Sequence, residues 1–208
     1  FGKPWRKMAG FYIMKVTLAI DTSTARTQFA VLLGNELKWL EIEDGATTHG
    51  DVLAKFGELA AREKIDQVIV GMGPGPFTGL RTGIIFAKSF AFARGLPIYG
   101  ICSLDAISLG INLPEFIIAT DARRKEIYWA RYQGGVRVEG PNVSAPDVLT
   151  KFSNLPIFGE GALKYNLTTD IEHLYPDITW FPKLAETNRI DEPLYLRHPD
   201  AVPTAERR

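Results

Sequence analysis

The stretch from residue 66 to residue 97, DQVIVGMGPGPFTGLRTGIIFAKSFAFARGLP, decides the fold of this chain. Its first part, Asp66 to Met72, contains a β-branched run that is typical of a buried strand. The loop of alternating glycine and proline at 73–76 ends that strand, because glycine adopts backbone angles closed to other residues and proline donates no hydrogen bond. Pro76 suits the first turn of a helix. The stretch therefore predicts a strand, a tight loop and a helix that begins at about residue 76 or 77.

The predicted helix, residues 77–94, carries apolar side chains around most of its circumference. A helix of this kind needs cover on more than one side, whereas a surface helix of a small monomer faces only one core. We therefore expect either other elements of the chain or a partner protein to cover it. Its apolar residues are Phe77, Leu80, Ile84 and Ala91 on one side, and Ile85, Phe86, Phe90, Phe92 and Ala93 around much of the rest.

The composition limits the function classes. The chain has 208 residues with 46% hydrophobic composition, enough for one good core or two small ones. Its 24 basic and 24 acidic residues balance, whereas a protein that binds nucleic acid alone usually has a basic excess. A role on RNA is thus expected to be indirect or shared. The single Cys102 excludes an internal disulfide and fits a reducing compartment.

The N-terminal residues differ from the rest of the chain. Residues 1–13 are basic and aromatic and precede Met14. Lys15 interrupts the apolar stretch early and no small-residue cleavage site follows, so a signal peptide is not expected. No apolar run approaches the roughly eighteen residues that span a membrane. We interpret residues 1–13 as an expression remnant or an upstream extension outside the fold.

The first half of the chain reads as strands followed by helices. Polar turns separate three predicted strands, and an amphipathic helix precedes the central stretch. After that stretch come a short strand and a helix for which Ser103 is the expected N-cap. The predicted strands are 15–20, 27–33, 36–42 and 98–100, and the predicted helices are 51–64 and 104–109.

The second half repeats this pattern. Asp21 and Asp121, Ala30 and Ala130, and Gly34 and Gly134 each lie one hundred positions apart. The repetition predicts a duplicated α/β unit, with any ligand in the crevice between the copies. Beyond residue 170 no reliable periodicity is found. The predicted strands are 115–120, 126–132, 136–139 and 155–158, and the predicted helices are 145–152 and 163–167.

The loop from Gly73 to Gly79 has two interpretations. Backbone N–H groups at a helix start converge on a phosphate or carboxylate, so Gly73, Gly75, Gly79 and Arg81 form a candidate anion or nucleotide loop. No Lys-Ser or Lys-Thr follows the glycines, so the loop is not a P-loop. The other interpretation is a tight connection between strand and helix, packed against the crevice.

The two polar hairpin turns are further candidates for a nucleotide site. Asp21 and Thr22 lie where a nucleotide-binding duplicated fold places its first phosphate loop, although such a turn is also a common hairpin. The matching second turn, Asp121 to Arg124, contains no glycine that would let the backbone approach a phosphate. This argues against tight ATP binding by the chain alone.

Side chains for metal or nucleophile chemistry are sparse. His49, His173 and His198 are far apart, and no H-x-x-x-H or H-E-x-x-H pair is present. Cys102 and Ser103 follow a strand without a G-x-S-x-G elbow. We therefore predict no metal site, no cofactor and no catalytic residue.

The residues from 73 to 107, GPGPFTGLRTGIIFAKSFAFARGLPIYGICSLDAI, closely resemble the signature of the TsaB (YeaZ) family. The flanking matches span nearly the whole chain after Met14. They are LAIDTST at 18–24, His49, DARRKEIYW at 121–129, residues 159–162 and PLYLR at 193–197. The chain departs from the usual pattern at Pro76, where relatives carry Ser, and at Gly50-Asp51, where Ser-Glu is common.

The resemblance implies an α/β duplicated RNase H-like (ASKHA, actin-like ATPase) fold with two βββαβα subdomains, at 14–112 and 113–208. It also implies a cytoplasmic, non-catalytic subunit. Such a subunit binds and stabilises the related catalytic subunit TsaD, which forms threonylcarbamoyladenosine at the anticodon-loop adenine of tRNA. A TsaE-like ATPase is a further implied partner, tRNA is contacted only through the complex, and a homodimer is expected for the chain alone.

Carried over to this sequence, the pairing helices are residues 51–64 and 77–94. The interface residues that the resemblance implies are Phe56, Leu59, Phe77, Leu80, Ile84, Ile85, Phe86 and Phe90. Two alternatives stay open. One is a stand-alone ATP-dependent phosphotransferase or ATPase with Asp21 and Asp121 near a magnesium ion. The other is a metallopeptidase, suggested by the naming of related proteins.

Overall fold

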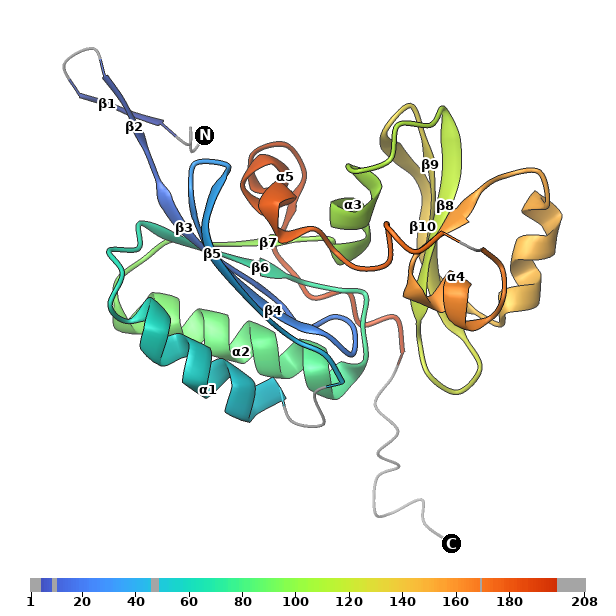
Figure 1. Cartoon of the computed structure of the whole chain (residues 1–208), viewed down its shortest axis with the longest axis horizontal. Coiled ribbons are helices and arrows are strands. Elements are labelled where there is room, and N and C mark those ends of the chain that lie inside the picture. The colour runs from blue at the N-terminus through green and yellow to red at the C-terminus, as the bar shows by residue number, and fades with distance from the viewer. Residues whose placement is uncertain (1–4, 9–10, 46–48, 169, 198–208) are drawn as a thin grey trace, which may run out of the picture.

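The structure, a computed structural model, describes residues 5–8, 11–45, 49–168 and 170–197. Two mixed sheets lie side by side, each with helices packed on its faces (Figure 1). Among the helices of these described ranges, none combines the length and the hydrophobicity that a membrane span requires.

The first sheet has six strands in the order β12-β7-β6-β3-β4-β5. The central strand β3 pairs antiparallel with β4 and parallel with β6, and β7 continues the parallel part. Residues 17–20 of β3 and all of β6 are buried, as expected for strands covered on both faces. The strands are β3 (Val16–Asp21), β4 (Thr27–Leu33), β5 (Glu36–Glu43), β6 (Gln67–Gly71), β7 (Ile98–Ile101) and β12 (Arg189–Ile190).

Helices cover both faces of this sheet. The helices α1 (His49–Ala60) and α2 (Phe77–Ala93) pack against one face, where their apolar residues join a core with Leu18, Phe29 and Val70. The 3-10 helix η2 (Ile178–Trp180) and α5 (Phe181–Thr187) cover the other face. The short α3 (Ser103–Ser108) lies between the two sheets (Figure 1).

The second sheet has four strands in the order β10-β9-β8-β11, with β11 parallel to β8. Its 3-10 helix η1 (Pro146–Phe152) and its helix α4 (Glu160–Lys164) pack on the face away from α3. The strands are β8 (Glu115–Asp121), β9 (Ile127–Gln133), β10 (Val136–Ser144) and β11 (Ile157–Phe158).

The two halves share one strand topology, so the predicted duplicated RNase H-like (ASKHA) fold is confirmed. Each half has three antiparallel strands, with the fourth strand parallel to the first. The predicted helices at 51–64, 77–94 and 104–109 appear at 49–60, 77–93 and 103–108. Gly34 and Gly134 both occupy hairpin turns with φ of 62° and 57°, a conformation that favours glycine.

The second half is thinner than the first, and three of its predicted elements differ in the structure. The helix expected at 145–152 is a 3-10 helix, the strand expected at 155–158 is reduced to two residues, and the helix expected at 163–167 begins at Glu160. The N-cap of α3 is Cys102, and Ser103 is the first helical residue. The Ser103 hydroxyl donates to Asp21 Oδ2 at 2.7 Å.

The C-terminal segment returns to the first sheet. Residues 178–187 pack on its open face, and β12 pairs antiparallel with β7. This pairing makes β12 an edge strand of the first sheet, although it follows the second half in the chain. The predicted boundary between the two subdomains, at residues 112 and 113, stays a prediction. It divides the chain by sequence order, whereas the C-terminal segment packs on the first sheet.

At the N-terminus, β1 (Trp5–Met8) and β2 (Phe11–Met14) form an antiparallel two-stranded sheet. This hairpin directly precedes β3 but does not extend the first sheet. The interpretation of residues 1–13 as an upstream extension stays a prediction, and residues 1–4 and 9–10 lie outside the described residues.

Candidate partner-binding face and interdomain site

Three residues expected at a partner interface are buried in the chain's own core. Phe56, Leu80 and Ile84 are at most 3% exposed, enclosed between α1, α2 and the first sheet. Side chains that the chain already encloses offer little surface to a partner, so the structure gives no support to these three interface positions. The periodicity identified apolar positions of the helices without telling which surface covers them.

Two phenylalanines of α2, Phe86 and Phe90, are partly covered by other residues of the chain. Phe86 lies against Gly57, where a Cβ atom would come 2.7 Å from the phenyl ring, and it contacts Phe29 at a ring distance of 5.8 Å. Phe90 stacks on Phe86 at 6.2 Å and lies below the Arg94 guanidinium. Glycine at 57 thus lets α1 approach α2 closely, and this contact uses much of the apolar surface that was expected to need a partner.

What α2 leaves uncovered is a narrow stripe. Ile85 is 50% exposed and Phe92 is 90% exposed, one on each side of the exposed Lys88 and Ser89. Their spacing of seven residues places both on one side of the helix. We call Ile85, Lys88, Ser89 and Phe92 the outer stripe of α2. Phe92 was absent from the expected interface, although its spacing from Ile85 was a usable signal.

Leu59 and Phe77 do not extend the outer stripe. Leu59 is 38% exposed, but it lies two residues after Gly57, which faces α2, so it points to another side of α1. Phe77 is half-buried against Tyr195, with ring centroids 5.0 Å apart. The expected interface residues therefore do not form one continuous face.

The glycine-rich loop is packed against the chain's own first hairpin turn. A Cβ atom on Gly75 would lie 2.8 Å from Ser23 Cα, and one on Gly79 would lie 3.0 Å from the Thr22 carbonyl oxygen. Gly73 has a φ of 89°, which permits this path. The Tyr128 hydroxyl donates to the Gly75 carbonyl at 3.2 Å. Protein atoms thus lie close against these glycines, which favours the interpretation as a tight connection. Arg81, the other member of the candidate loop, is exposed.

Asp21 is buried where the first hairpin turn meets β6 and α3. Its Oδ1 accepts from the Ser23 N–H at 2.9 Å and from the Ser23 hydroxyl at 2.7 Å, and its Oδ2 accepts from Ser103 at 2.7 Å. Gly71 leaves room for this carboxylate, since a Cβ atom there would collide with Oδ2. Burial raises the pKa of the Asp21 carboxyl, and the hydrogen bonds from the two serines lower it by less.

Because its folded-state pKa lies above the value of the unfolded chain, Asp21 stabilises the fold fully below about pH 3.8. That contribution is lost as the pH rises through the folded-state pKa. Asp21→Asn retains an acceptor for Ser23 and offers a donor to Ser103 without a charge. We expect the free energy of unfolding of the variant, relative to that of the native chain, to be higher at pH 8 than at pH 4. Urea titrations at the two pH values measure this difference. An equal difference at both pH values would contradict this, and Asp191→Asn at an exposed site is the control.

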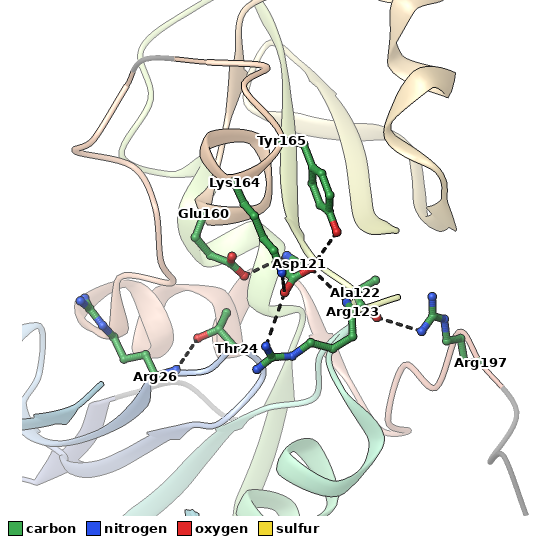
Figure 2. Close-up of polar contacts among 9 residues, drawn as sticks. All are labelled: Thr24, Arg26, Asp121, Ala122, Arg123, Glu160, Lys164, Tyr165 and Arg197. Carbon is green, nitrogen blue, oxygen red and sulfur yellow. Dashed lines mark hydrogen bonds and ion pairs between the residues drawn. The ribbon is translucent and has the colours of Figure 1, made fainter. Parts of the chain in front are cut away.

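The second hairpin turn also holds a carboxylate, but in a basic environment (Figure 2). Asp121 Oδ2 lies 2.6 Å from Lys164 Nζ and 3.7 Å from Arg123, and Oδ1 accepts from Tyr165. Glu160 accepts the Asp121 N–H at 2.8 Å, and burial raises the pKa of the Glu160 carboxyl. Asp21 and Asp121 are thus each engaged within their own half, an arrangement that gives no support to a shared magnesium ion.

His49, the first residue of α1, lies next to β4 and α2. Its Nδ1 lies 2.6 Å from the Thr27 hydroxyl, and its ring contacts the position of Gly79. Burial, with a smaller contribution from the charge of Arg123, lowers the pKa of His49, so the neutral ring is favoured. Among the residues that the structure describes, no group of three His, Cys, Asp or Glu side chains is placed to hold a metal ion.

A third buried carboxylate, not identified from the sequence, joins the two halves. Asp105 of α3 accepts from Tyr132 of β9 at 2.7 Å and from Asn188 after α5 at 2.7 Å. Arg137 of β10 pairs with it at 3.1 Å. Burial raises the pKa of Asp105, an effect that the Arg137 charge partly offsets. Next to it, burial raises the pKa of the Cys102 thiol to about 12, so this cysteine is not a nucleophile at neutral pH.

A cavity of about 620 Å³ opens beside Asp105. It lies between the helices α3 and α5 on one side and the strands β9 and β10 on the other, and its volume is in the range of small-molecule sites. Its walls mix hydroxyl, carboxylate and apolar groups, so they do not define one ligand. Besides Asp105, Tyr132 and Arg137, the walls include Ser108, Val136, Glu139, Leu184 and Thr187.

The fold and these sites define the class of protein. It is a duplicated RNase H-like (ASKHA) protein whose glycine loop is packed against its own turn. Solved structures agree on the fold. A protein from Pseudomonas aeruginosa described as similar to peptidase YeaZ superposes with a TM-score of 0.69 at 22% identity, covering 88% of this chain and all of that one. YeaZ from the same organism gives 0.64 at 23% identity, over 83% and 91%.

Sequence comparison identifies the family. The family profile described as "TsaD: tRNA N6-adenosine threonylcarbamoyltransferase" matches residues 53–177. An uncharacterised protein of Mycobacterium tuberculosis is 37% identical over 92% of this chain and 96% of its own length. The TsaB protein of Escherichia coli is 35% identical, but over only 44% of this chain and 38% of its own. The chain belongs to the TsaD family and is related to its YeaZ (TsaB) members.

Proposed function

We propose that this chain is a non-catalytic subunit that binds and stabilises a TsaD-like catalytic subunit in the formation of threonylcarbamoyladenosine on tRNA. The observation that carries the proposal is the outer stripe of α2, where a phenylalanine is 90% exposed on a helix within the family's matched region. Exposed aromatic side chains of this kind are frequent anchors of protein interfaces. The related TsaB proteins are described as tRNA threonylcarbamoyladenosine biosynthesis proteins.

The proposal includes the surroundings of the complex. A TsaE-like ATPase is a further partner, tRNA is contacted through the assembled complex, and the complex acts in the cytoplasm. The chain alone forms a homodimer through α1 and α2, because two copies can cover each other's Ile85 and Phe92. The catalytic residues belong to the TsaD-like subunit.

The test is co-purification with the TsaD-like protein of the same organism, followed by a threonylcarbamoylation assay with and without this chain. We expect a stable mixed complex, and modification that requires both proteins. The proposal fails if no complex forms, or if the TsaD-like protein modifies tRNA equally well alone.

Nucleotide binding by the chain alone is expected to be weak. The turn from Asp121 to Arg124 lacks glycine, and the loop at Gly73 to Gly79 is packed against Thr22 and Ser23. Calorimetry with ATP and magnesium should give a dissociation constant above about 0.1 mM, which is weaker than about 5.5 kcal/mol of binding free energy. Tighter binding would favour the alternative of a stand-alone ATPase or phosphotransferase, with Gly73, Gly75, Gly79 and Arg81 as its anion loop. Bound zinc in a metal assay of fresh protein would support the metallopeptidase alternative.

A further inference from the structure

Three consecutive basic residues form the tip of the turn between β8 and β9. Arg123, Arg124 and Lys125 are exposed, and all have left-handed φ values, at 61°, 53° and 62°. Residues with a Cβ atom adopt this conformation rarely, and seldom in succession. Hydrogen bonds close the turn, from the Glu126 N–H to the Arg123 carbonyl and from the Ala122 N–H to the Glu126 carbonyl, both at 2.9 Å. The backbone of this turn thus holds three positively charged side chains at one exposed tip.

More cations surround the turn (Figure 2). Lys164 of α4 is 47% exposed, and Arg197 pairs with Glu126 while donating to the Ala122 carbonyl at 2.9 Å. Arg26 of the facing hairpin turn lies over the Tyr175 ring at 3.8 Å. The chain as a whole has no net charge, so this cluster is a local basic excess.

Two acidic groups of the region, Asp121 and Glu160, lie beneath the exposed cations, whereas Glu126 and Asp44 are accessible and pair with Arg197 and Arg26. Asp121 is buried and lies nearest to Lys164, and the half-buried Glu160 accepts a backbone N–H. Arg123 is 57% exposed and 3.7 Å from Asp121, so this contact contributes little to stability. No ion pair joins Lys125 to another residue that the structure describes. The charges of Arg123 and Lys125 therefore contribute little to holding the fold together.

A row of exposed guanidinium and ammonium groups is complementary to the repeated phosphates of a nucleic acid backbone. We propose that the turn at 123–125, together with Lys164, contacts the sugar-phosphate backbone of an RNA when the chain is assembled with its catalytic partner. This inference rests on the proposed function, since the family profile is that of a tRNA-modifying enzyme. Because the chain has no net charge, we expect it to supply only a few of the phosphate contacts. The catalytic partner would supply the rest of the RNA-binding surface.

The test compares two variants that each lose three positive charges. The first is Arg123→Asn, Arg124→Asn and Lys125→Asn, because asparagine tolerates left-handed backbone. The control is Lys38→Gln, Lys151→Gln and Lys183→Gln, at exposed positions outside the turn. Binding of an unmodified tRNA transcript to the complex with the TsaD-like subunit is measured at several salt concentrations. The first variant should weaken binding at least ~10-fold and lower the slope of log K against log salt by about two to three, while the control stays within ~3-fold.

Equal tRNA affinity of the native and first-variant complexes would overturn the inference while leaving the proposed function intact. The first variant could also fail to assemble with the TsaD-like subunit, while any complex that does form binds tRNA normally. That result would place the turn against the partner protein and would also overturn the inference. If the native chain forms no complex, the proposed function fails. The same tRNA titrations are then carried out on the chain alone. The inference is rejected if the chain alone does not bind tRNA, or if the two variants bind it equally well.

Discussion

Gly71→Ala is expected to lower the free energy of unfolding by about 3 kcal/mol. Gly71 ends β6, and a Cβ atom there would collide with Asp21 Oδ2 and lie 2.7 Å from Ser103 Oγ. Both groups are buried, and they hold the first hairpin turn, β6 and α3 together. The added methyl group must displace a buried carboxylate from its hydrogen bonds, which combines overpacking with loss of a polar network. Urea unfolding followed by circular dichroism measures the change.

Gly50→Ala is the matched control for this substitution. Gly50 lies in the first turn of α1, and a Cβ atom added there would have Thr82 Cγ2 as its nearest neighbour, at 4.0 Å. Alanine there should leave stability unchanged or raise it by up to about 1 kcal/mol. If Gly71→Ala were as mild as Gly50→Ala, Asp21 would not be held in the packed position described above.

The double substitution Ile85→Asp and Phe92→Asp should weaken binding to the TsaD-like subunit at least ~100-fold, or about 2.7 kcal/mol. Both side chains lie on the outer stripe, so a buried interface there would have to desolvate two carboxylates. Since Phe92 is 90% exposed and Ile85 is 50% exposed, the fold should lose little stability. Titration calorimetry measures the binding, and thermal unfolding checks the fold.

Ile171→Asp is the control for the outer stripe, because Ile171 is 72% exposed and lies far from α2 in the chain. It should leave binding within about threefold. Phe86→Asp is a poor test of the same surface, since Phe86 packs on Gly57 and Phe29 and its loss would disturb the core. Equal binding by the native and doubly substituted chains would remove the outer stripe from the interface.

The central stretch and the duplication could be predicted because their signals are local. The β-branched run before Gly73-Pro74 and the spacing of Gly34 and Gly134 need no knowledge of distant residues. The structure places α2 at Phe77–Ala93, beginning where the loop chemistry indicated. Glycine and proline determine where strands and helices end through their backbone geometry. Predictions based on these residues therefore depend little on tertiary packing.

The return of the chain to the first sheet could not be predicted in the same way. The helix α5 buries Phe181, Leu184 and Ala185 at helical spacing, but it has only seven residues and contains Pro182. Proline is compatible with a first helical turn, yet in a short segment it reads as a break. The hydrogen bonds of Asp105 were also invisible, since Tyr132 and Asn188 are 27 and 83 positions away.

The partner face stays a prediction, and the structure limits the part of α2 that is open to a partner. The apolar character of α2 indicated that the helix is covered on several sides. In the structure, α1 and the first sheet cover Leu80, Ile84 and Phe86 of α2. Helical periodicity locates stripes without identifying what each one contacts. The short outer stripe is therefore a finding of the tertiary structure.

The most direct test of the central proposal is sedimentation velocity of an equimolar mixture of this chain and the TsaD-like protein of the same organism. We predict a mixed complex with the native chain, and separate components with the Ile85→Asp, Phe92→Asp variant. Separate components with the native chain, or an undiminished complex with the variant, would contradict the account.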